Sequence, residues 1–400
     1  MRPGRLVSAF ISFVFAVSFA VPASAMITTP AEHAVLADGA TGQILWDKNG
    51  DVAMPPASMS KLMTLELLFQ RLKDGRVKLT DTFPVSELAW RTGGSKMFVK
   101  VGNSVPVEDL IRGIIIDSGN DACVVVAQAL GGTIQGFADM MNRRAKELGL
   151  EHSHFVNPDG LPEPPGQLMS ARDLAHLARH IIVTYPQYYH YFSERDFTWN
   201  GIHQTNRNTV LEMLPGADGL KTGHTEAAGY GIVASAQRGG QRFVLVLGGL
   251  RFPDLDQYSP RKKDWLAEQR RGQEAARVLE SAFREFRGYK LFDAGAVVGH
   301  APVWQGSKES VPLVLKQKLG VMMQVDSRSA MKVSLDYDGP VQAPVRKGQQ
   351  IGTLSVTAPG FPSARVPVYA GESIGSAGFF DRILTGLKAL FTGAPAEQSQ

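Results

Sequence analysis

Residues 55–64 read PPASMSKLMT, and this stretch decides how the chain is interpreted. It places Ser58 three residues before Lys61, directly after two prolines and at the start of an apolar run. Two more short motifs follow in order, SGN at residues 118–120 and KTG at residues 221–223. Each motif alone is weak support for any function. The ordered set is typical of enzymes that acylate a serine and use lysine, instead of histidine, as its partner.

Ser58 and Lys61 have the local setting that such a pair needs. Prolines suit the approach to a helix, so Ser58 is expected at a helix N-terminus with Lys61 on the same face. A serine hydroxyl needs a base, and Lys61 can serve if burial or a neighbouring charge, such as Lys221, lowers its pKa. Further Ser-x-x-Lys matches at residues 259–262 and 329–332 lack this setting. Alone, the pattern more often marks a helix cap beside a solvated lysine.

The SGN motif is a short polar interruption between two apolar runs. It predicts a tight loop within the core, although an ordinary turn has the same composition. In that loop the Ser118 hydroxyl can relay a proton between Lys61 and a leaving group. The Asn120 side-chain amide offers both a donor and an acceptor to a substrate backbone.

The KTG motif is expected to open a strand. Ideal alternation places Lys221 and Gly223 on one face of the strand and Thr222 on the other. Gly223 lets a substrate backbone approach and pair with the strand edge. Lys221 and Thr222 suit recognition of a terminal carboxylate. The backbone amides of Ser58 and His224 could form an oxyanion hole.

Residues 1–25 are expected to be an export signal. Arg2 and Arg5 precede an apolar run, and Ala-Ser-Ala ends at residue 25. The alternative is a membrane-spanning anchor, for which the run is short. The formal net charge of the chain is +4, and without these two arginines it is +2. So small a charge gives no basis for nucleic-acid binding, which needs a dense basic face.

Residues 26–287 are expected to form a catalytic domain that mixes helices and strands. Apolar residues recur there at both helical and strand spacing. The predicted helices span residues 62–72, 134–148, 171–183 and 263–286, and the predicted strands span residues 220–236 and 243–250.

The pattern changes after residue 287. Residues 288–377 alternate apolar with polar side chains between Gly and Pro breaks, which predicts a small all-β sandwich. Residues 378–393 repeat apolar side chains at helical spacing, and residues 394–400 are a polar tail. We expect residues 378–393 to form an amphipathic helix in the membrane interface, although a helix docked on its own domain would have the same pattern.

The sequence predicts no metal and no cofactor. The single cysteine, Cys123, lies in an apolar run and is expected to be a buried core residue instead of a nucleophile. His176 and His180 stand four apart on a predicted helix, but Leu177 occupies the position where a metalloprotease motif has glutamate.

Taken together, the motifs resemble those of the low-molecular-mass penicillin-binding proteins, specifically the D-alanyl-D-alanine carboxypeptidases of bacterial cell walls. The resemblance is carried by PASMSKLMT at 56–64, SGNDAC at 118–123, KTGHT at 221–225, AGY at 228–230 and VASA at 233–236. It implies an α+β fold of the serine β-lactamase/D,D-peptidase type, a five-stranded antiparallel sheet flanked by helices, with a helical subdomain that carries SGN. The β-rich C-terminal domain and the amphipathic tail also match the plan of this family.

The resemblance also implies a reaction and a set of roles. Ser58 would attack the carbonyl of the penultimate D-alanine of a peptidoglycan stem peptide, with Lys61 as general base and Ser118 as proton relay. The terminal D-alanine would leave, water would hydrolyse the acyl-enzyme, and β-lactams would inhibit by acylating the same serine. Arg251 falls where relatives keep an arginine near the substrate carboxylate, although Leu250 interrupts their Gly-Gly-Arg pattern. The implied substrate contacts are Asn120, Lys221, Thr222 and Gly223.

Three alternatives remain at this point. A D,D-endopeptidase would use the same acyl-enzyme. A β-lactamase would share the motifs, but residues 161–165, LPEPP, do not resemble its carboxylate-bearing loop around Glu163. A non-catalytic wall-peptide-binding protein would not need the intact serine and lysine set. The expected location is the periplasmic face of the bacterial inner membrane, with peripheral attachment through residues 378–393.

Overall fold

The computed structural model describes residues 27–378 of the chain. The predicted export signal at residues 1–25, most of the predicted helix at 378–393 and the tail at 394–400 lie outside the described residues. Within residues 27–378, no helix is both long and apolar enough to cross a bilayer. The boundaries predicted for the domains stay predictions.

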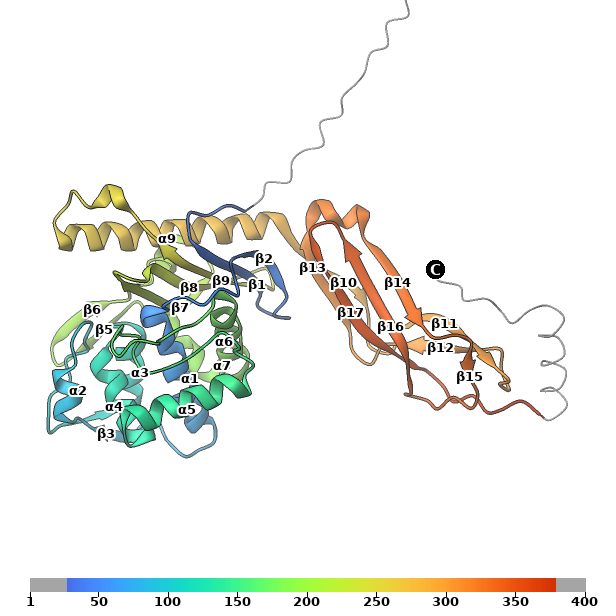
Figure 1. Cartoon of the computed structure of the whole chain (residues 1–400), viewed down its shortest axis with the longest axis horizontal. Coiled ribbons are helices and arrows are strands. Elements are labelled where there is room, and N and C mark those ends of the chain that lie inside the picture. Colours follow the sequence, from blue (N-terminus) through green and yellow to red (C-terminus); the bar gives the residue numbers. More distant parts are fainter. Residues whose placement is uncertain (1–26, 379–400) are drawn as a thin grey trace, which may run out of the picture.

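A five-stranded antiparallel sheet forms the centre of the N-terminal part and confirms the predicted architecture (Figure 1). Its strand order is β2-β1-β9-β8-β7, so that β7, which carries the KTG motif, lies at one edge. The strands are β1 (His33–Asp38), β2 (Ile44–Lys48), β7 (Ala217–Thr225), β8 (Gly229–Arg238) and β9 (Gln241–Leu250).

One prediction about this sheet was wrong. Residues 220–236 were expected to form a single strand, but they belong to two antiparallel strands, β7 and β8, which pair with each other. The chain reverses between Thr225 and Gly229, where Gly229 has a φ of 66° that glycine adopts without strain. The turn residues Glu226, Ala227 and Ala228 include no Gly, Pro, Asn or Asp, so the sequence lacks the usual signal of a turn at this position.

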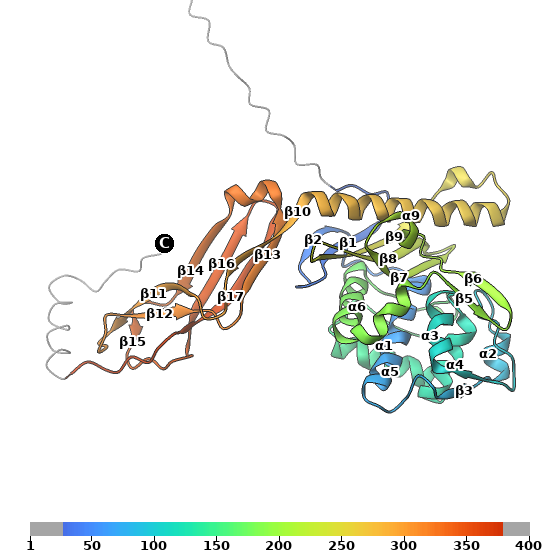
Figure 2. The same ribbon diagram turned by 180° about the vertical axis from the view of Figure 1, so that it is seen from behind.

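Helices cover both faces of the sheet (Figures 1 and 2). The long helix α9 (Pro260–Glu285) covers one face, where its buried residues join one hydrophobic cluster with those of β8 and β9. A larger group of helices lies on the other face. It consists of α1 (Lys61–Lys73), α2 (Glu87–Arg91), α3 (Val107–Ile115), α4 (Asn120–Gly131), α5 (Ile134–Glu147), α6 (Ala171–Thr184) and α7 (Pro186–Tyr189). The short helix α8 (Val210–Met213) instead packs against α9, and its Val210 belongs to the same hydrophobic cluster.

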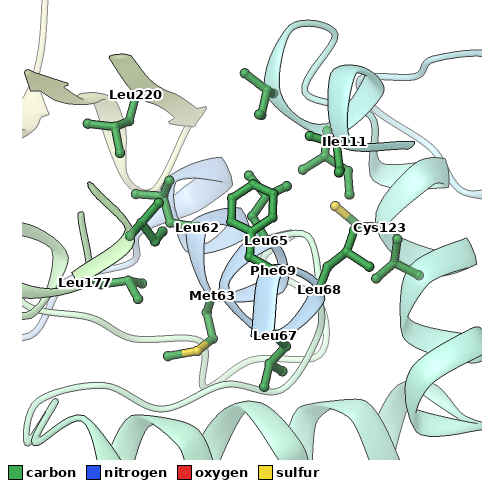
Figure 3. Close-up of a cluster of buried hydrophobic side chains, with 14 of the residues drawn as sticks. Leu62, Met63, Leu65, Leu67, Leu68, Phe69, Ile111, Cys123, Leu177 and Leu220 are labelled. Atoms are coloured by element: carbon green, nitrogen blue, oxygen red, sulfur yellow. The ribbon is translucent and has the colours of Figure 1, made fainter. Parts of the chain in front are cut away.

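Helix α1 is buried almost all round, and this fixes the position of its first residue, Lys61. Apolar side chains from α3, α4, α6 and β7 surround it (Figure 3). A helix that is apolar on all sides belongs inside a protein. Cys123 lies in this cluster with none of its surface exposed, which confirms its predicted place in the core. Burial raises the pKa of its thiol to about 12.

Short elements complete this part of the chain. Two short antiparallel strand pairs lie among the helices, β3 (Thr82–Pro84) with β4 (Ser104–Pro106) and β5 (Asp196–Trp199) with β6 (Ile202–Thr205).

A separate β domain follows α9 and confirms the predicted change to strands. Its strands form a two-stranded sheet, β10-β13, and a six-stranded sheet, β14-β16-β17-β12-β11-β15, which enclose a hydrophobic cluster of their own. The strands are β10 (Phe286–Phe292), β11 (Val297–Trp304), β12 (Ser310–Val314), β13 (Leu319–Gln324), β14 (Lys332–Tyr337), β15 (Val341–Gln342), β16 (Gln350–Ala358) and β17 (Phe361–Ala370).

Candidate active site

Ser58 lies in a short 3-10 turn, η1 (Ala57–Ser60), which runs directly into α1. The fully buried Lys61 amine lies 2.6 Å from the Ser58 hydroxyl oxygen and 2.5 Å from the carbonyl oxygen of Asp159. The predicted pair is therefore assembled, with the lysine nitrogen within hydrogen-bond distance of the serine it would deprotonate.

Burial lowers the pKa of Lys61 because a charged ammonium group is disfavoured away from water. The positive charge of Arg207 also lowers this pKa, whereas the carboxylate of Asp159 opposes the shift. A lysine with a lowered pKa can hold its amine neutral and accept a proton, which the ordinary surface lysine cannot do near neutral pH.

Ser118 and Lys221 form a second serine–lysine pair. The Lys221 side-chain nitrogen donates to the Ser118 hydroxyl at 3.0 Å and to the carbonyl of Thr222 at 3.2 Å. Ser118 has a φ of 55°, a left-handed conformation that lets the loop turn sharply before α4. Burial holds the pKa of Lys221 well below its usual range, and the charge of Lys61 lowers it further. Two buried, mutually repelling lysines therefore disfavour a state in which both are charged.

The side chain of Asn120 is hydrogen-bonded within the protein. Asn120 is the first residue of α4, it is 3% exposed, and its side-chain amide donates to the carbonyl of Gly93 at 2.8 Å. It does not line the cavity that holds Ser58. In this structure Asn120 fixes the loop that carries Ser95, and its direct contact with substrate stays a prediction.

Strand β7 approaches the serine turn closely at Gly223. A Cβ atom added to Gly223 would lie 2.9 Å from the carbonyl oxygen of Pro56 and 3.1 Å from the amide nitrogen of Ser58. Only glycine fits there without displacing the nucleophile turn. The ring of His224 stacks on Tyr230, with ring centroids 3.8 Å apart. The oxyanion hole predicted from the amides of Ser58 and His224 stays a prediction.

A cavity of about 160 Å³ lies where these elements meet. Five predicted residues line it: Ser58, Ser118, Thr222, Gly223 and His224. Lys61 and Lys221 lie beneath it, bonded to the two serines.

Two arginines in the cavity wall, Arg207 and Arg271, were not predicted as site residues from the sequence. Arg207 follows β6 and donates to the Ser95 hydroxyl at 2.6 Å. Arg271 projects from α9 and is 2% exposed. It donates to the carbonyl of Arg207, while its Nε has no hydrogen-bond partner among residues 27–378. Burial lowers the pKa of Arg271 to about 10. Paired guanidinium groups suit a carboxylate.

A signal for one of these arginines was present in the sequence. Arg271 stands four residues after Ala267 and four before Ala275, both fully buried, so it lies on the apolar face of α9. A charged residue on the buried face of a helix is a candidate functional residue. Arg207 lies in an irregular segment without periodicity, and nothing in its local sequence distinguishes it.

The predicted contact of Arg251 with substrate is not supported by its position. Its side chain is half exposed and donates to the backbone carbonyls of Glu226 and Ala227, in the turn between β7 and β8. Leu250 continues β9 before Arg251, and the guanidinium therefore reaches this turn instead of the cavity. Arg207 and Arg271 supply positive charge in the cavity instead.

Comparison with known proteins gives a consistent result along the chain. Residues 19–250 match the D-alanyl-D-alanine carboxypeptidase family, and residues 286–376 match the penicillin-binding protein 5 C-terminal domain. The chain is 36% identical to D-alanyl-D-alanine carboxypeptidase DacD of Escherichia coli (strain K12), over 95% of this chain and 97% of that protein. It is 34% identical to DacA of the same organism, over 90% and 88% of the two chains.

Solved structures agree with these matches. Penicillin-binding protein 5 from Haemophilus influenzae superimposes with a TM-score of 0.75 at 34% identity, covering 88% of this chain and 100% of that chain. Penicillin-binding protein D2 from Listeria monocytogenes, in its ampicillin-bound form, superimposes with a TM-score of 0.56 at 26% identity, covering 64% and 99%.

Proposed function

The chain belongs to the D-alanyl-D-alanine carboxypeptidase family, and from this membership we propose that Ser58 is the nucleophile of a serine-type D-Ala-D-Ala carboxypeptidase. The enzyme is a penicillin-binding hydrolase with a role in the bacterial cell wall. Its proposed substrate is the pentapeptide stem of peptidoglycan. One observation carries the assignment of the nucleophile, namely the 2.6 Å contact between Ser58, which lines the cavity, and the buried Lys61 beneath it.

Acylation begins with proton transfer from the Ser58 hydroxyl to neutral Lys61. The serine oxygen attacks the carbonyl carbon of the penultimate D-alanine, and a C–O bond forms while the carbonyl oxygen becomes an oxyanion. The amides of Ser58 and His224 are proposed to stabilise that charge. Both residues lie in regular elements, η1 and β7, which fix the directions of the two amides before the charge develops.

Collapse of the tetrahedral intermediate breaks the peptide bond. The amine of the terminal D-alanine needs a proton, and Ser118 is proposed to pass one on from Lys61, with Lys221 bonded to its oxygen. Free D-alanine leaves, and an ester remains on Ser58. Water then attacks the ester, the same groups move the proton, and the shortened peptide is released.

Substrate is held by charge and by strand pairing. The terminal carboxylate is proposed to bind Thr222, Arg207 and Arg271, since all three residues line the cavity and two of them carry guanidinium groups. The peptide backbone is proposed to pair with β7 near Gly223, because β7 is an edge strand of its sheet.

The test is D-alanine release from a synthetic pentapeptide that ends in D-Ala-D-Ala. Wild-type protein should release one D-alanine per peptide, and the Ser58→Ala variant should release none. Equal release by both proteins would remove Ser58 from its role. Cleavage of cross-linked dimeric peptides in preference to the pentapeptide would instead identify an endopeptidase.

We also propose that β-lactams acylate Ser58. The ampicillin-bound structure of Listeria monocytogenes penicillin-binding protein D2 supports binding of this drug class within the same fold. A fluorescent penicillin should label the wild type and persist on it. Rapid turnover of the drug, with no lasting label, would favour a β-lactamase.

The proposed location is the periplasmic face of the inner membrane. It rests on the export-signal pattern of residues 1–25 and on the amphipathic pattern of residues 378–393. Removal of residues 378–400 should shift the protein from the membrane fraction to the periplasmic fraction. Retention of the truncated protein in the membrane fraction would disprove this attachment.

A further inference from the structure

A second cavity lies between α1 and α5, away from the site described above. Its volume is about 270 Å³, compared with about 160 Å³ for the cavity that holds Ser58. Helix α1 lines it with residues 67, 70, 71 and 74, helix α5 with residues 140, 143, 144 and 147, and Arg76 lies just beyond the end of α1. Arg71 is about 15 Å from Lys61 along the axis of α1, so the two cavities lie at opposite ends of this helix.

Four arginines line this second cavity, and only one of them is neutralised. Arg144 forms ion pairs with Glu66 and Glu147, both at 2.8 Å, which hold its guanidinium group in the wall. The other three arginines make neither an ion pair nor a side-chain hydrogen bond among residues 27–378, and they are Arg71, Arg76 and Arg143. A single further acid, Asp74, completes the charged lining. The wall of the cavity therefore carries an excess of positive charge.

The three arginines are not explained as caps of the two helices. Basic side chains near a helix C-terminus can bond the last carbonyl groups. Here backbone amides occupy those carbonyls, since the amides of Arg76 and Val77 bond the carbonyl of Arg71, and the amide of Leu148 bonds that of Arg144. Like charges that gather in one place repel each other, so the cluster costs stability unless an anion is bound.

We propose that this cavity binds a phosphate or diphosphate group. Guanidinium groups bond phosphate oxygens in pairs, and three of them suit a group that carries several oxygens and more than one negative charge. A lone carboxylate would leave at least one of the three without a partner. The volume lies near the lower end of the range for small-ligand sites, about 300 Å³. The inference is independent of the proposed function, because none of these residues lines the cavity around Ser58.

The test is a calorimetric titration of pyrophosphate into the full-length protein at constant ionic strength. Wild-type protein should bind pyrophosphate at one site, and acetate should bind at least about tenfold more weakly. The Arg71→Gln/Arg143→Gln variant should lose at least about tenfold in affinity, because two charge-assisted contacts are removed. The Asp74→Asn variant should bind pyrophosphate about twofold to fivefold more tightly, because a negative charge leaves the wall.

A matched control separates this site from a general effect of charge. The Arg261→Gln/Arg365→Gln variant also removes two exposed arginines, one on α9 and one on β17, and should keep the wild-type affinity. Both double variants should keep the wild-type rate of labelling by a fluorescent penicillin, which also shows that they fold. Weaker binding by both double variants to the same extent would overturn the proposal.

Vesicles of phosphatidylglycerol and phosphatidylcholine distinguish the source of the phosphate. A lipid headgroup is the source if wild-type protein sediments with the vesicles more than the Arg71→Gln/Arg143→Gln variant does, and if pyrophosphate competes. Equal sedimentation of the two proteins, with pyrophosphate binding intact, identifies a phosphate outside the lipid. No binding of pyrophosphate by the wild type, equal affinity for acetate, or weaker binding by Asp74→Asn would overturn the phosphate site and leave the carboxypeptidase function intact.

Discussion

Replacement of Asp117 by asparagine is expected to stabilise the protein at pH 8, by an amount that disappears near pH 4. Asp117 directly precedes Ser118 in the second motif and is 1% exposed. Neither of its carboxylate oxygens has a hydrogen-bond partner among residues 27–378. An ionised carboxylate in such a place is costly, because it has lost water without gaining a bonded partner.

The size of the effect follows from the pKa of Asp117. Burial raises that pKa from 3.8 to about 7, although the charges of Arg207 and Lys221 oppose the shift. A shift of roughly 3 units corresponds to about 4 kcal/mol of folding free energy. Because the folded-state pKa is the higher one, the cost is small below pH 4, grows between pH 4 and 7, and is complete above pH 7. The amide of the substituted asparagine would also lack a hydrogen-bond partner. This costs the variant about 1–3 kcal/mol of folding free energy at every pH.

The measurement is urea unfolding of the wild type and of Asp117→Asn at pH 4, 6 and 8. The difference in unfolding free energy between the two proteins should change by about 4 kcal/mol between pH 4 and pH 8, in favour of the variant at high pH. Replacement of the exposed Asp139 by asparagine is the control and should give a nearly constant difference. A difference for Asp117→Asn that is equally constant would refute the reasoning.

Three further predictions follow from the packing around the site. Gly223→Ala should slow acylation by a fluorescent penicillin by about 100-fold and lower the thermal unfolding temperature, because its Cβ would lie 2.9 Å from the carbonyl oxygen of Pro56 and crowd the amide of Ser58. An unchanged acylation rate would contradict the close approach of β7. Gly160→Ala should lower the unfolding free energy by more than about 2 kcal/mol in a denaturant titration, because its Cβ would lie 2.0 Å from the carbonyl oxygen of Ala57 at a φ of 83°. Cys123, fully buried and with its pKa raised to about 12, should resist a thiol reagent at pH 8 in the native protein and react after denaturation; fast native labelling would show that the core opens.

Much of the site could be predicted because its chemistry is local in sequence. Ser58 and Lys61 are three residues apart at a helix start, so helical geometry alone brings them together. The contact between Ser118 and Lys221 joins residues 103 positions apart. No periodicity predicts that contact, and only the ordered set of motifs indicated it.

The residues that were missed or misplaced depend on tertiary structure. Arg207 reaches the cavity from an irregular segment, and Arg271 reaches it from α9. Arg251 was predicted as a substrate contact from its resemblance to the Gly-Gly-Arg pattern of relatives, but β9 continues through Leu250, and the guanidinium contacts the turn between β7 and β8. Composition and spacing contain no information about such directions.

The position of β7 at the edge of its sheet also affects how the protein avoids aggregation. An unpaired strand edge is a template for any extended chain, including a strand of another molecule. Here η1, α8 and η2 (His190–Ser193) contact β7 along its length. The exposed part of the edge is therefore short. The sheet can accept the end of a flexible peptide without offering a long edge for strand pairing between two copies of the protein. Substrate access and resistance to aggregation therefore both depend on η1, α8 and η2.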